Sequence, residues 1–442
     1  MRAPHHRGLC VAAAFVALAS SPASAKDGEW EARFEARARV EAIDGQFRPE
    51  PVAERDAALT LRTSLFAEYD AGPIRIGGEL LDSRAYFQRR RSSISTNEVN
   101  ALEPLQAYVR ADLGERAQAM AGRFTFDLGS RRLVARNAFR NTINVFTGVR
   151  AEFGDDAFGA AAFWTVAPTR LPDDPEGIRN DSVELDRERG APVFFGAFAR
   201  RLTGAGRVEA YLYRLRERDA ADILTRDRRL WTAGGRLFRA PAAGRFDWEL
   251  EGAYQWGRAR ATADAADALD RRVSAGFVHG AVGRTLPGAW RPRVQFAVDY
   301  GSGDGDGPTL GRFDTLFGAR FFDFGPTGLL GAVQRANLVS VELRGEARPD
   351  ARTNLHLAVR PLRLARATDA FAATGVRDPQ GRAGRNAGTQ VDLRARRTLV
   401  PDRLTATAGM VYLAKGRFLT DAANAPPARD TRYGFVELLL TL

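Results

Sequence analysis

Residues Trp30–Ala42 read W-E-A-R-F-E-A-R-A-R-V-E-A, an unbroken alternation of apolar residues with Glu or Arg. In a β-strand, successive side chains point to opposite faces, so this stretch has one apolar face and one charged face. Charged side chains cannot pack unpaired into a protein core. A transmembrane β-barrel accommodates both faces, because its outer wall contacts hydrocarbon and its lumen contains water. The stretch therefore favours a membrane barrel.

The same alternation recurs in segments about as long as a tilted membrane-crossing strand, ~9–11 residues. In one of them, odd-numbered residues from Leu105 to Leu113 are apolar and are expected to face opposite to Gln106–Asp112. A soluble antiparallel sheet also alternates, but rarely on nearly every strand of a chain of 442 residues. Further alternating segments lie near 59–69, 246–256, 293–300, 339–346, 389–396 and 431–442, and weaker ones near 192–201, 207–217 and 271–284.

The connections between these segments are alternately short and long. Outer-membrane barrels have short periplasmic turns and long extracellular loops, with both chain ends in the periplasm. Eight short and nine long connections predict an all-β, antiparallel up-and-down barrel of about 18 strands. The short connections carry Gly, Pro and Asp, as tight turns do, and are expected at 70–73, 114–116, 154–156, 202–206, 240–244, 285–291, 348–352 and 399–402. The long ones are expected near 44–57, 87–104, 127–143, 167–191, 218–229, 258–270, 301–336, 365–386 and 414–430.

The N-terminus has the features of a secretory signal. A positively charged start precedes the apolar stretch Leu9–Ala19 and the cleavage-type sequence Ala23-Ser24-Ala25. We expect residues 1–25 to be a signal peptide and residues 26–442 to form a single barrel domain in the outer membrane. The only cysteine, Cys10, lies in the signal, so the mature chain would contain no disulfide.

The composition is basic, with a formal net charge of +11. Nearly all basic residues are Arg, since Lys26 and Lys415 are the only lysines. A basic chain can bind nucleic acid, but the signal peptide and the alternation of positive with negative charges argue against that partner. Arg in place of Lys, together with a high Ala content, is also typical of a G+C-rich genome.

Residues that could carry out catalysis or bind a metal are sparse. Outside the signal, His279 and His356 are isolated in strands, and no His/Cys spacing typical of a metal site is present. No G-x-S-x-G sequence occurs either. The stretch Gly301–Gly307 is rich in Asp and Gly, but it lacks the closing Glu of a calcium-binding loop. We expect a passive channel with no enzymatic activity and no cofactor.

Arginines with inward strand parity are the more informative set. The guanidinium group stays charged and can fork onto carboxylates, so a ring of arginines in a lumen would attract anions. Acidic residues share this face, and the alternative is a ladder of ion pairs that only stiffens the wall. The arginines with inward parity are Arg37, Arg39, Arg62, Arg75, Arg110, Arg150, Arg293, Arg344, Arg360, Arg394 and Arg396. From these we select Arg62, Arg110, Arg150, Arg293, Arg344, Arg360 and Arg394 as pore-lining candidates.

Several motifs resemble the alginate export family of outer-membrane barrels. They are Gly122-Arg123 followed by Asp127, Gly129, Arg131 and Arg132, then Asn141–Arg150, Tyr300–Asp304 and Arg312–Phe317. The resemblance implies an eighteen-stranded barrel with an electropositive pore through which a polyuronate leaves the cell. By position, it implies substrate contacts at Arg123, Arg132, Arg140 and Arg150.

The chain departs from the family pattern in two places. Phe124 follows Gly122-Arg123 where the family typically has Gln. The short turns contain no insertion that could plug the lumen from the periplasm, so a constriction would come from long loops such as 87–104 or 301–336.

The sequence therefore predicts an outer-membrane pore for an anionic polysaccharide, with outer-membrane lipid and a periplasmic export complex as candidate partners. The main alternative is a general or anion-selective diffusion porin for small solutes. An outer-membrane enzyme or adhesin is a third class.

Overall fold

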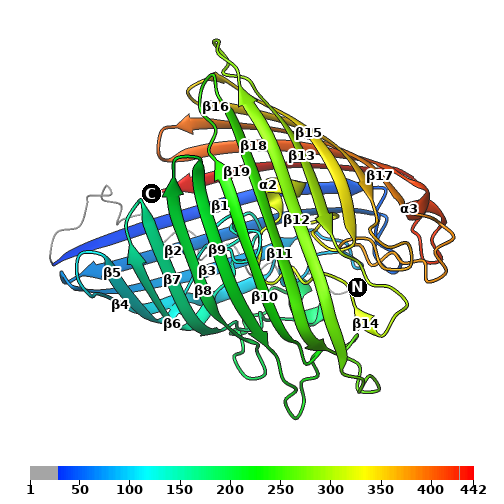
Figure 1. Ribbon diagram of the computed structural model, residues 1–442, viewed down its shortest axis with the longest axis horizontal. Coiled ribbons are helices and arrows are strands. Elements are labelled where there is room, and N and C mark those ends of the chain that lie inside the picture. Colours follow the sequence, from blue (N-terminus) through cyan, green and yellow to red (C-terminus); the bar gives the residue numbers. More distant parts are fainter. Residues whose placement is uncertain (1–27, 428) are drawn as a thin grey trace, which may run out of the picture.

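The computed structural model describes residues 28–427 and 429–442, and the predicted signal peptide lies outside them. Eighteen long strands pair antiparallel in chain order, and β1 pairs with both β2 and β19, which closes the ring (Figure 1). A further strand, β14, is only two residues long and pairs parallel with β12. The predicted all-β up-and-down barrel is confirmed, as is the number of its wall strands.

The strands are β1 (Glu29–Asp44), β2 (Arg55–Asp70), β3 (Ile74–Tyr86), β4 (Asn100–Asp112), β5 (Ala117–Phe124), β6 (Phe146–Gly154), β7 (Phe158–Val166), β8 (Val193–Thr203), β9 (Gly206–Arg216), β10 (Arg229–Arg239), β11 (Phe246–Ala259), β12 (Arg271–Thr285), β13 (Arg293–Gly301), β14 (Thr309–Leu310), β15 (Leu338–Asp350), β16 (Thr353–Arg363), β17 (Asn386–Val400), β18 (Leu404–Lys415) and β19 (Thr431–Thr441). Three short helices lie in long loops: α1 (Pro175–Arg179), α2 (Phe321–Phe324) and α3 (Arg417–Asp421). Among the described residues, no helix has the length and hydropathy needed to cross a membrane.

Short and long connections alternate around the barrel, as predicted. The short ones range from the turn 204–205 to the turn 286–292, and β1 begins and β19 ends at this end of the barrel. The long ones range from loop 45–54 to loop 302–337 and lie at the other end. In barrels of this type the short turns face the periplasm, so the long loops face the outside.

The side chains of the wall alternate between lipid and lumen. On β1, Val40 is 56% exposed on the outer face, whereas Arg39 is 1% exposed in the interior. Exposed aromatic residues lie near both ends of the wall, with Trp30 at the short-turn end and Trp164 and Trp256 near the long loops. Aromatic residues at these two levels are typical of the membrane interfaces.

The prediction for Leu105 is wrong. Glu79 pairs with Gln106 and Leu80 pairs with Pro104, which leaves Leu105 as an extra, bulged residue on β4. A bulge shifts the parity of one strand, so Leu105 points inward, where it is fully buried. It packs there in a small cluster with Leu81, Ile143 and Val145.

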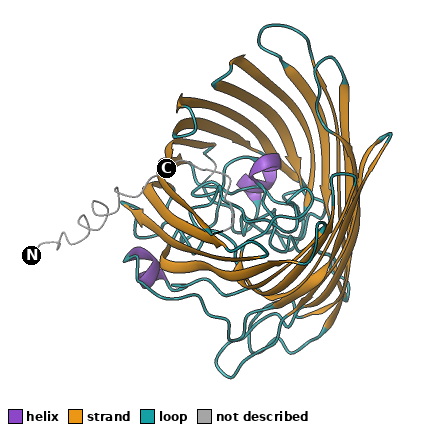
Figure 2. Ribbon diagram, turned by 90° about the vertical axis from the view of Figure 1, so that its left-hand side faces the viewer, coloured by secondary structure: helices purple, strands orange, loops and turns teal. Residues whose placement is uncertain are grey.

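The three weakly alternating segments do form strands, as β8, β9 and β12. Their alternation is weak because their inner faces are also apolar: Phe194, Tyr213 and Phe277 point inward and are buried. The residues they contact come from loops that turn back into the barrel, such as Phe317, whose ring lies 5.0 Å from that of Phe194. Figure 2, which looks in from the short-turn side, shows loops and a helix inside the ring of strands.

The assignment of side chains to the lipid side or the inner side of the wall can be tested at Leu343, which is 58% exposed at the centre of β15. We expect Leu343→Arg to lower the free energy of unfolding in lipid by about 2–4 kcal/mol, because the charge would face hydrocarbon near the midplane. The control is Thr407→Arg, since Thr407 lines an internal pocket of about 350 Å³. Chemical denaturation of both variants in vesicles provides the comparison, and a larger loss for Thr407→Arg would mean that the facing is inverted.

Candidate functional site: a constriction formed by two loops

Two long loops meet in the middle of the lumen. Loop 125–145 and loop 302–337 are joined by main-chain hydrogen bonds, from the Phe317 amide to the Leu133 carbonyl (3.0 Å) and from the Ala319 amide to the Arg131 carbonyl (2.8 Å). The Asn144 side chain adds a bond to the Phe317 carbonyl at 2.9 Å. Because both loops are bonded through their backbones, the obstruction has a defined shape. Loop 301–336, one of the two loops from which the sequence predicts a constriction, thus meets loop 125–145 inside the barrel. Loop 302–337 is also hydrogen-bonded to loop 364–385, for example from the Asn337 side chain to the Asp369 carbonyl at 3.1 Å.

Three arginines of the wall hold the tip of loop 125–145. Arg37 on β1 and Arg62 on β2 both donate to the carbonyl oxygens of Ala138 and Arg140, at 2.8–3.1 Å. Arg39 donates to the Phe139 carbonyl at 2.7 Å. Bonds from charged donors are the stronger kind, so these arginines anchor the loop to β1 and β2.

Two aromatic rings continue this contact across the lumen. Phe139 and Phe321, the first residue of α2, stack with ring centroids 3.8 Å apart. The guanidinium of Arg39 lies 4.0 Å from the Phe139 ring, and that of Arg394 on β17 lies 4.6 Å from the Phe321 ring. Cation–π contacts therefore cover the outer faces of the stack, and the stack connects β1 to β17 through both loops.

Arg132 ties loop 125–145 to the opposite wall. Its guanidinium contacts Glu249 and Glu251 of β11, the latter at 2.6 Å, and Asp323 of α2 at 3.0 Å. These carboxylates raise the pKa of Arg132 against the opposing effect of burial. Arg335 also contacts Asp323. The charge of Arg132 is therefore compensated several times over, which is the condition for burying an ion pair stably.

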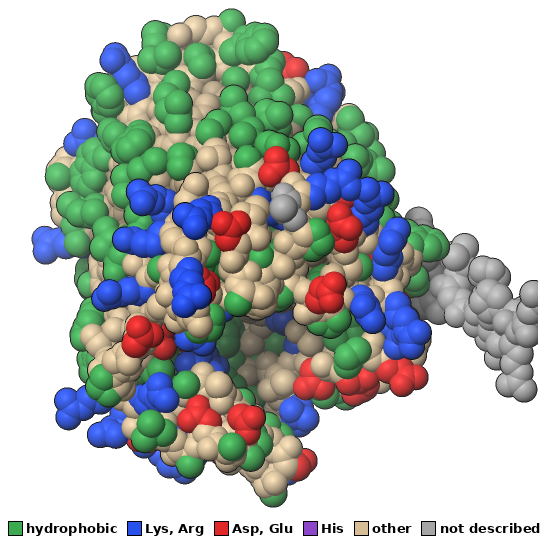
Figure 3. Space-filling view, turned by 90° about the vertical axis from the view of Figure 1, so that its right-hand side faces the viewer, with side chains coloured by type: hydrophobic (Ala, Val, Ile, Leu, Met, Phe, Trp, Pro, Cys, Tyr) green, Lys and Arg blue, Asp and Glu red, His purple; other side chains and the backbone are tan. Residues whose placement is uncertain are grey.

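A polar cleft of about 420 Å³ lies on the outer side of the constriction. Three of its arginines, Arg140, Arg170 and Arg320, have no carboxylate at ion-pair distance among the described residues. Their partners are uncharged oxygen atoms: Asn97 Oδ1 for Arg140 (2.6 Å), the Thr96 carbonyl for Arg170 (3.2 Å) and Gln334 Oε1 for Arg320 (3.2 Å). Figure 3, viewed from the side of the long loops, shows a hollow bordered by charged side chains.

The cleft carries an excess of positive charge, since five arginines and two aspartates, Asp173 and Asp186, line it. Burial lowers the pKa of Arg140 well below its ordinary value, and the neighbouring Arg170 and Arg320 lower it further. In a cleft that holds little water, guanidinium groups that repel one another are stabilised when an anion binds between them. Each guanidinium can also donate two parallel hydrogen bonds to one carboxylate. The cleft is therefore suited to bind carboxylates.

A second pocket, of about 300 Å³, lies on the other side of the constriction. It contains Arg131, whose guanidinium lies over the Phe322 ring at 3.8 Å. Asn137 and Ala319 line both this pocket and the outer cleft. These two residues therefore mark the level at which the two spaces meet.

The structure places the ten arginines from the sequence analysis in two environments. Within the described part of the chain, nine of them contact at least one carboxylate, and Arg140 contacts none. Sequence analysis missed Arg170 and Arg320, because both lie in long loops, where strand parity gives no direction. The nine pairs are Arg62–Glu35, Arg110–Glu68, Arg123–Glu103, Arg132–Glu251, Arg150–Glu152, Arg293–Asp247, Arg344–Glu342, Arg360–Asp299 and Arg394–Asp392.

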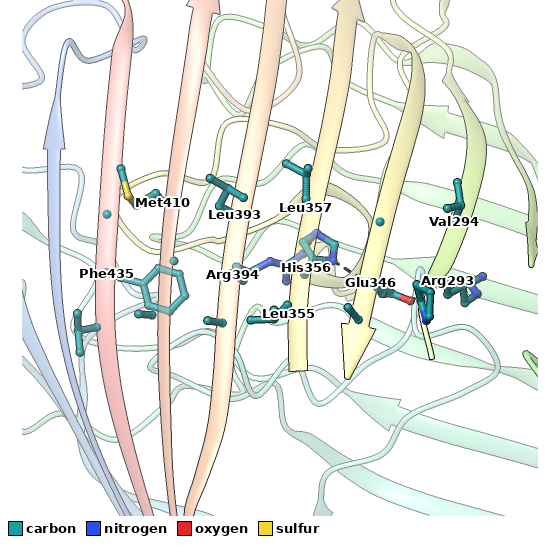
Figure 4. A pocket seen from close by; sticks show the side chains of 18 of the residues that line it. Arg293, Val294, Glu346, Leu355, His356, Leu357, Leu393, Arg394, Met410 and Phe435 are labelled. Carbon is teal, nitrogen blue, oxygen red and sulfur yellow. Dashed lines mark hydrogen bonds and ion pairs between the residues drawn. The ribbon is translucent and has the colours of Figure 1, made fainter. Parts of the chain in front are cut away.

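The paired side chains on the inner face of the strands are here called the wall ladder. Figure 4 shows part of it, a row across adjacent strands formed by Arg394, His356, Glu346 and Arg293. Arg394 lies 2.6 Å from His356 Nε2, and Arg293 donates to Glu346 at 3.0 Å. The pocket drawn there, of about 900 Å³, is lined mostly by apolar side chains of the outward parity, such as Met410. It opens on the lipid-facing side of the wall, so it lies outside the path of a solute.

Within residues 28–427 and 429–442, no group of three His, Cys, Asp or Glu side chains could hold a metal ion. The Asp- and Gly-rich stretch after β13 is held by protein contacts: the Asp304 amide donates to Asp369, and Asp304 accepts from the Gly311 amide.

Glu98, in loop 87–99, gives the outer cleft a titratable neighbour. It is 2% exposed, and among the described residues its carboxylate accepts hydrogen bonds only from Ser95, at 3.0 and 3.2 Å. Burial, with a smaller effect of Glu41, raises the pKa of Glu98 to about 7. Its contribution to stability is therefore complete below the ordinary pKa of a glutamate and is lost as the pH rises through about 7.

We expect the pore to become less anion-selective as the pH rises from about 5.5 to about 8.5, because ionised Glu98 would offset the charge of Arg140. Reversal potentials in planar bilayers measure this selectivity. Glu98→Gln should keep the low-pH selectivity throughout this range. An equal pH dependence in both proteins would assign the titration to other groups.

Comparison with known proteins agrees with the barrel fold described above. The chain matches the family model described as alginate export over residues 31–431. No curated protein matches it. Similar solved structures include Pseudomonas aeruginosa OccK3 (OpdO), with 16% identity, a TM-score of 0.55 and coverage of 94% of this chain and 96% of that one. Acinetobacter baumannii OccAB1 has 10% identity, a TM-score of 0.59 and coverage of 93% and 96%.

A third similar structure is Pseudomonas aeruginosa OccK2 (OpdF) in complex with glucuronate, with 12% identity, a TM-score of 0.55 and coverage of 94% of this chain and 97% of that one. Identities this low show the shared fold alone, whereas the family model spans nearly the whole chain. The protein is an outer-membrane β-barrel channel and belongs to the alginate export family.

Proposed function

We propose that this barrel passes an anionic polysaccharide of the polyuronate type out of the cell, through the constriction between loops 125–145 and 302–337. In this proposal residues 1–25 are removed on export and residues 26–442 form the working channel. The observation that carries the proposal is the uneven balance of charge in the interior. Nine of the ten arginines selected from the sequence are paired with carboxylates, whereas Arg140, Arg170 and Arg320 in the outer cleft have none at ion-pair distance among the described residues.

A polyuronate carries one carboxylate on each sugar. The unpaired arginines would supply several weak sites on the outer side of the constriction, and Arg131 would supply another on the inner side. Multiple weak sites favour conduction, because a solute must enter easily and must also leave. The wall ladder would contribute little to the selection of anionic solutes, since its guanidinium groups already contact carboxylates.

The second candidate is an anion-selective porin for small solutes. It is favoured by the main-chain bonds that join the two loops, because these bonds hold the loops together between spaces of about 420 and 300 Å³, which suit small solutes. A bound glucuronate in a barrel of the same fold is in keeping with both candidates.

The binding role of the cleft can be tested by neutralising its arginines. We expect the variant Arg140→Gln, Arg170→Gln, Arg320→Gln to raise the half-blocking concentration of an oligouronate at least tenfold, since charge-assisted hydrogen bonds contribute about 1.5–3 kcal/mol each. Single-channel current in planar bilayers measures the block. The control is Arg110→Gln, which removes a wall arginine that is paired with Glu68. An equal loss in both variants would refute a specific role for the cleft.

The two candidates differ in how block depends on the length of the solute. For an export channel we expect block to strengthen steadily from the monomer to a hexamer, because a longer chain contacts arginines on both sides of Asn137 and Ala319. A porin would pass the monomer and bind the hexamer no more tightly. Titrating one preparation with oligomers of defined length separates the two.

A further inference from the structure

The lipid-facing side of the barrel carries a row of four arginines next to the long loops. In the strand register Arg229 lies opposite Arg216 on one side and Arg258 on the other, and Arg258 lies opposite Arg272. These four residues, here called the arginine row, cross β9, β10, β11 and β12 without interruption. All four have the outward parity of their strands, the parity of the exposed Leu212.

The charges of the row are only partly balanced. Asp270 contacts Arg229 at 2.7 Å and Arg258 at 3.3 Å, and Asp227 lies 3.5 Å from Arg229. Neither Arg216 nor Arg272 contacts a carboxylate within the part of the chain that the structure describes. Like charges on directly opposite strand positions are destabilising. Four guanidinium groups against two carboxylates therefore leave an excess of positive charge.

On the opposite wall of the barrel, the corresponding outward positions beside the long loops carry charges of both signs. At the loop end of β1, Asp44 lies between Arg432 on β19 and Arg55 on β2. Arg55 bonds to Asp44 at 2.9 Å, and Arg429 lies 3.3 Å from it. That row alternates in sign, so the excess of positive charge is a property of β9 to β12 and not of every strand end.

The arginine row lies at the level of the membrane interface. Two positions further into the wall, Trp231 lies opposite Trp256, and their rings stack at 6.4 Å. Arg214 lies over the Trp231 ring at 4.9 Å, and Tyr254 stacks on Trp256 at 6.0 Å. Aromatic belts lie at headgroup level, so guanidinium groups just beyond this belt are level with lipid phosphates.

We propose that the arginine row binds the phosphorylated headgroup of a glycolipid in the outer leaflet of the outer membrane. Guanidinium groups bind phosphate through paired N–H donors. Neighbouring strands lie about 4.8 Å apart, so the row extends over roughly 14 Å, enough to contact more than one phosphate of a single headgroup. The acyl chains of that lipid would cover the apolar wall below the aromatic belt. This inference does not depend on which solute passes through the lumen.

The test uses the full barrel, purified, stripped of lipid and placed in phosphatidylcholine nanodiscs with bisphosphorylated lipid A as the probe. Native mass spectrometry counts the lipid A retained. We expect Arg216→Gln, Arg258→Gln, Arg272→Gln to weaken binding on the order of 100-fold, at about 1 kcal/mol for each arginine removed. Single-channel conductance should be unchanged, because the row lies outside the lumen, and this shows that the variant is folded.

The matched control is Arg55→Gln, Arg432→Gln, which removes arginines from the alternating row on the opposite wall. It should retain lipid A as the native protein does. Dephosphorylated lipid A should not be retained by either protein, and millimolar inorganic phosphate should not displace the phosphorylated lipid. Equal losses in the two variants, binding of the dephosphorylated lipid, or displacement by inorganic phosphate would each overturn the proposal.

Discussion

Closure of the sheet between β1 and β19 is the constraint on which the rest of the structure depends. Within hydrocarbon, an unpaired backbone amide or carbonyl costs several kcal/mol, so a spanning sheet can have no free edge. The register from Glu35 opposite Thr441 to Asp44 opposite Arg432 removes that edge. Once the ring is closed, the parity of each strand decides whether a side chain meets lipid or the interior, and the charged half of the alternating pattern must point inward.

The interior therefore contains many paired charges and a smaller number of unpaired arginines, and it is not a uniformly positive tube. Most of the wall arginines selected from the sequence pair with carboxylates on the same strand or on nearby strands. Three arginines of β1 and β2 donate to backbone carbonyl oxygens of loop 125–145. These pairs largely cancel one another at a distance. The local electrostatic field inside the channel thus depends more on arginines with no carboxylate at ion-pair distance among the described residues, such as Arg140, Arg170 and Arg320.

Much of the wall could be predicted from the sequence, because alternation and turn composition are local properties. Strand number, turn positions and the inward parity of Arg110 or Arg293 follow from them. The inward turn of Leu105 could not be predicted, since a bulge depends on the neighbouring strand. The selection of Arg140 came from the family resemblance, and nothing in a single sequence marks Arg170, whose environment is set by loops far apart in the chain. The arginine row is likewise invisible until the register of four strands is known.

The two loops that meet at Asn137 and Ala319 are bonded to each other, to other long loops and to inward side chains, while the ring of strands closes without them. The width of the barrel and the width of its constriction are therefore encoded by different parts of the chain. Substitutions in loops 125–145 and 302–337 can alter what fits through without disturbing insertion into the bilayer. Descendants of one barrel can in this way diversify their cargo while the scaffold stays the same.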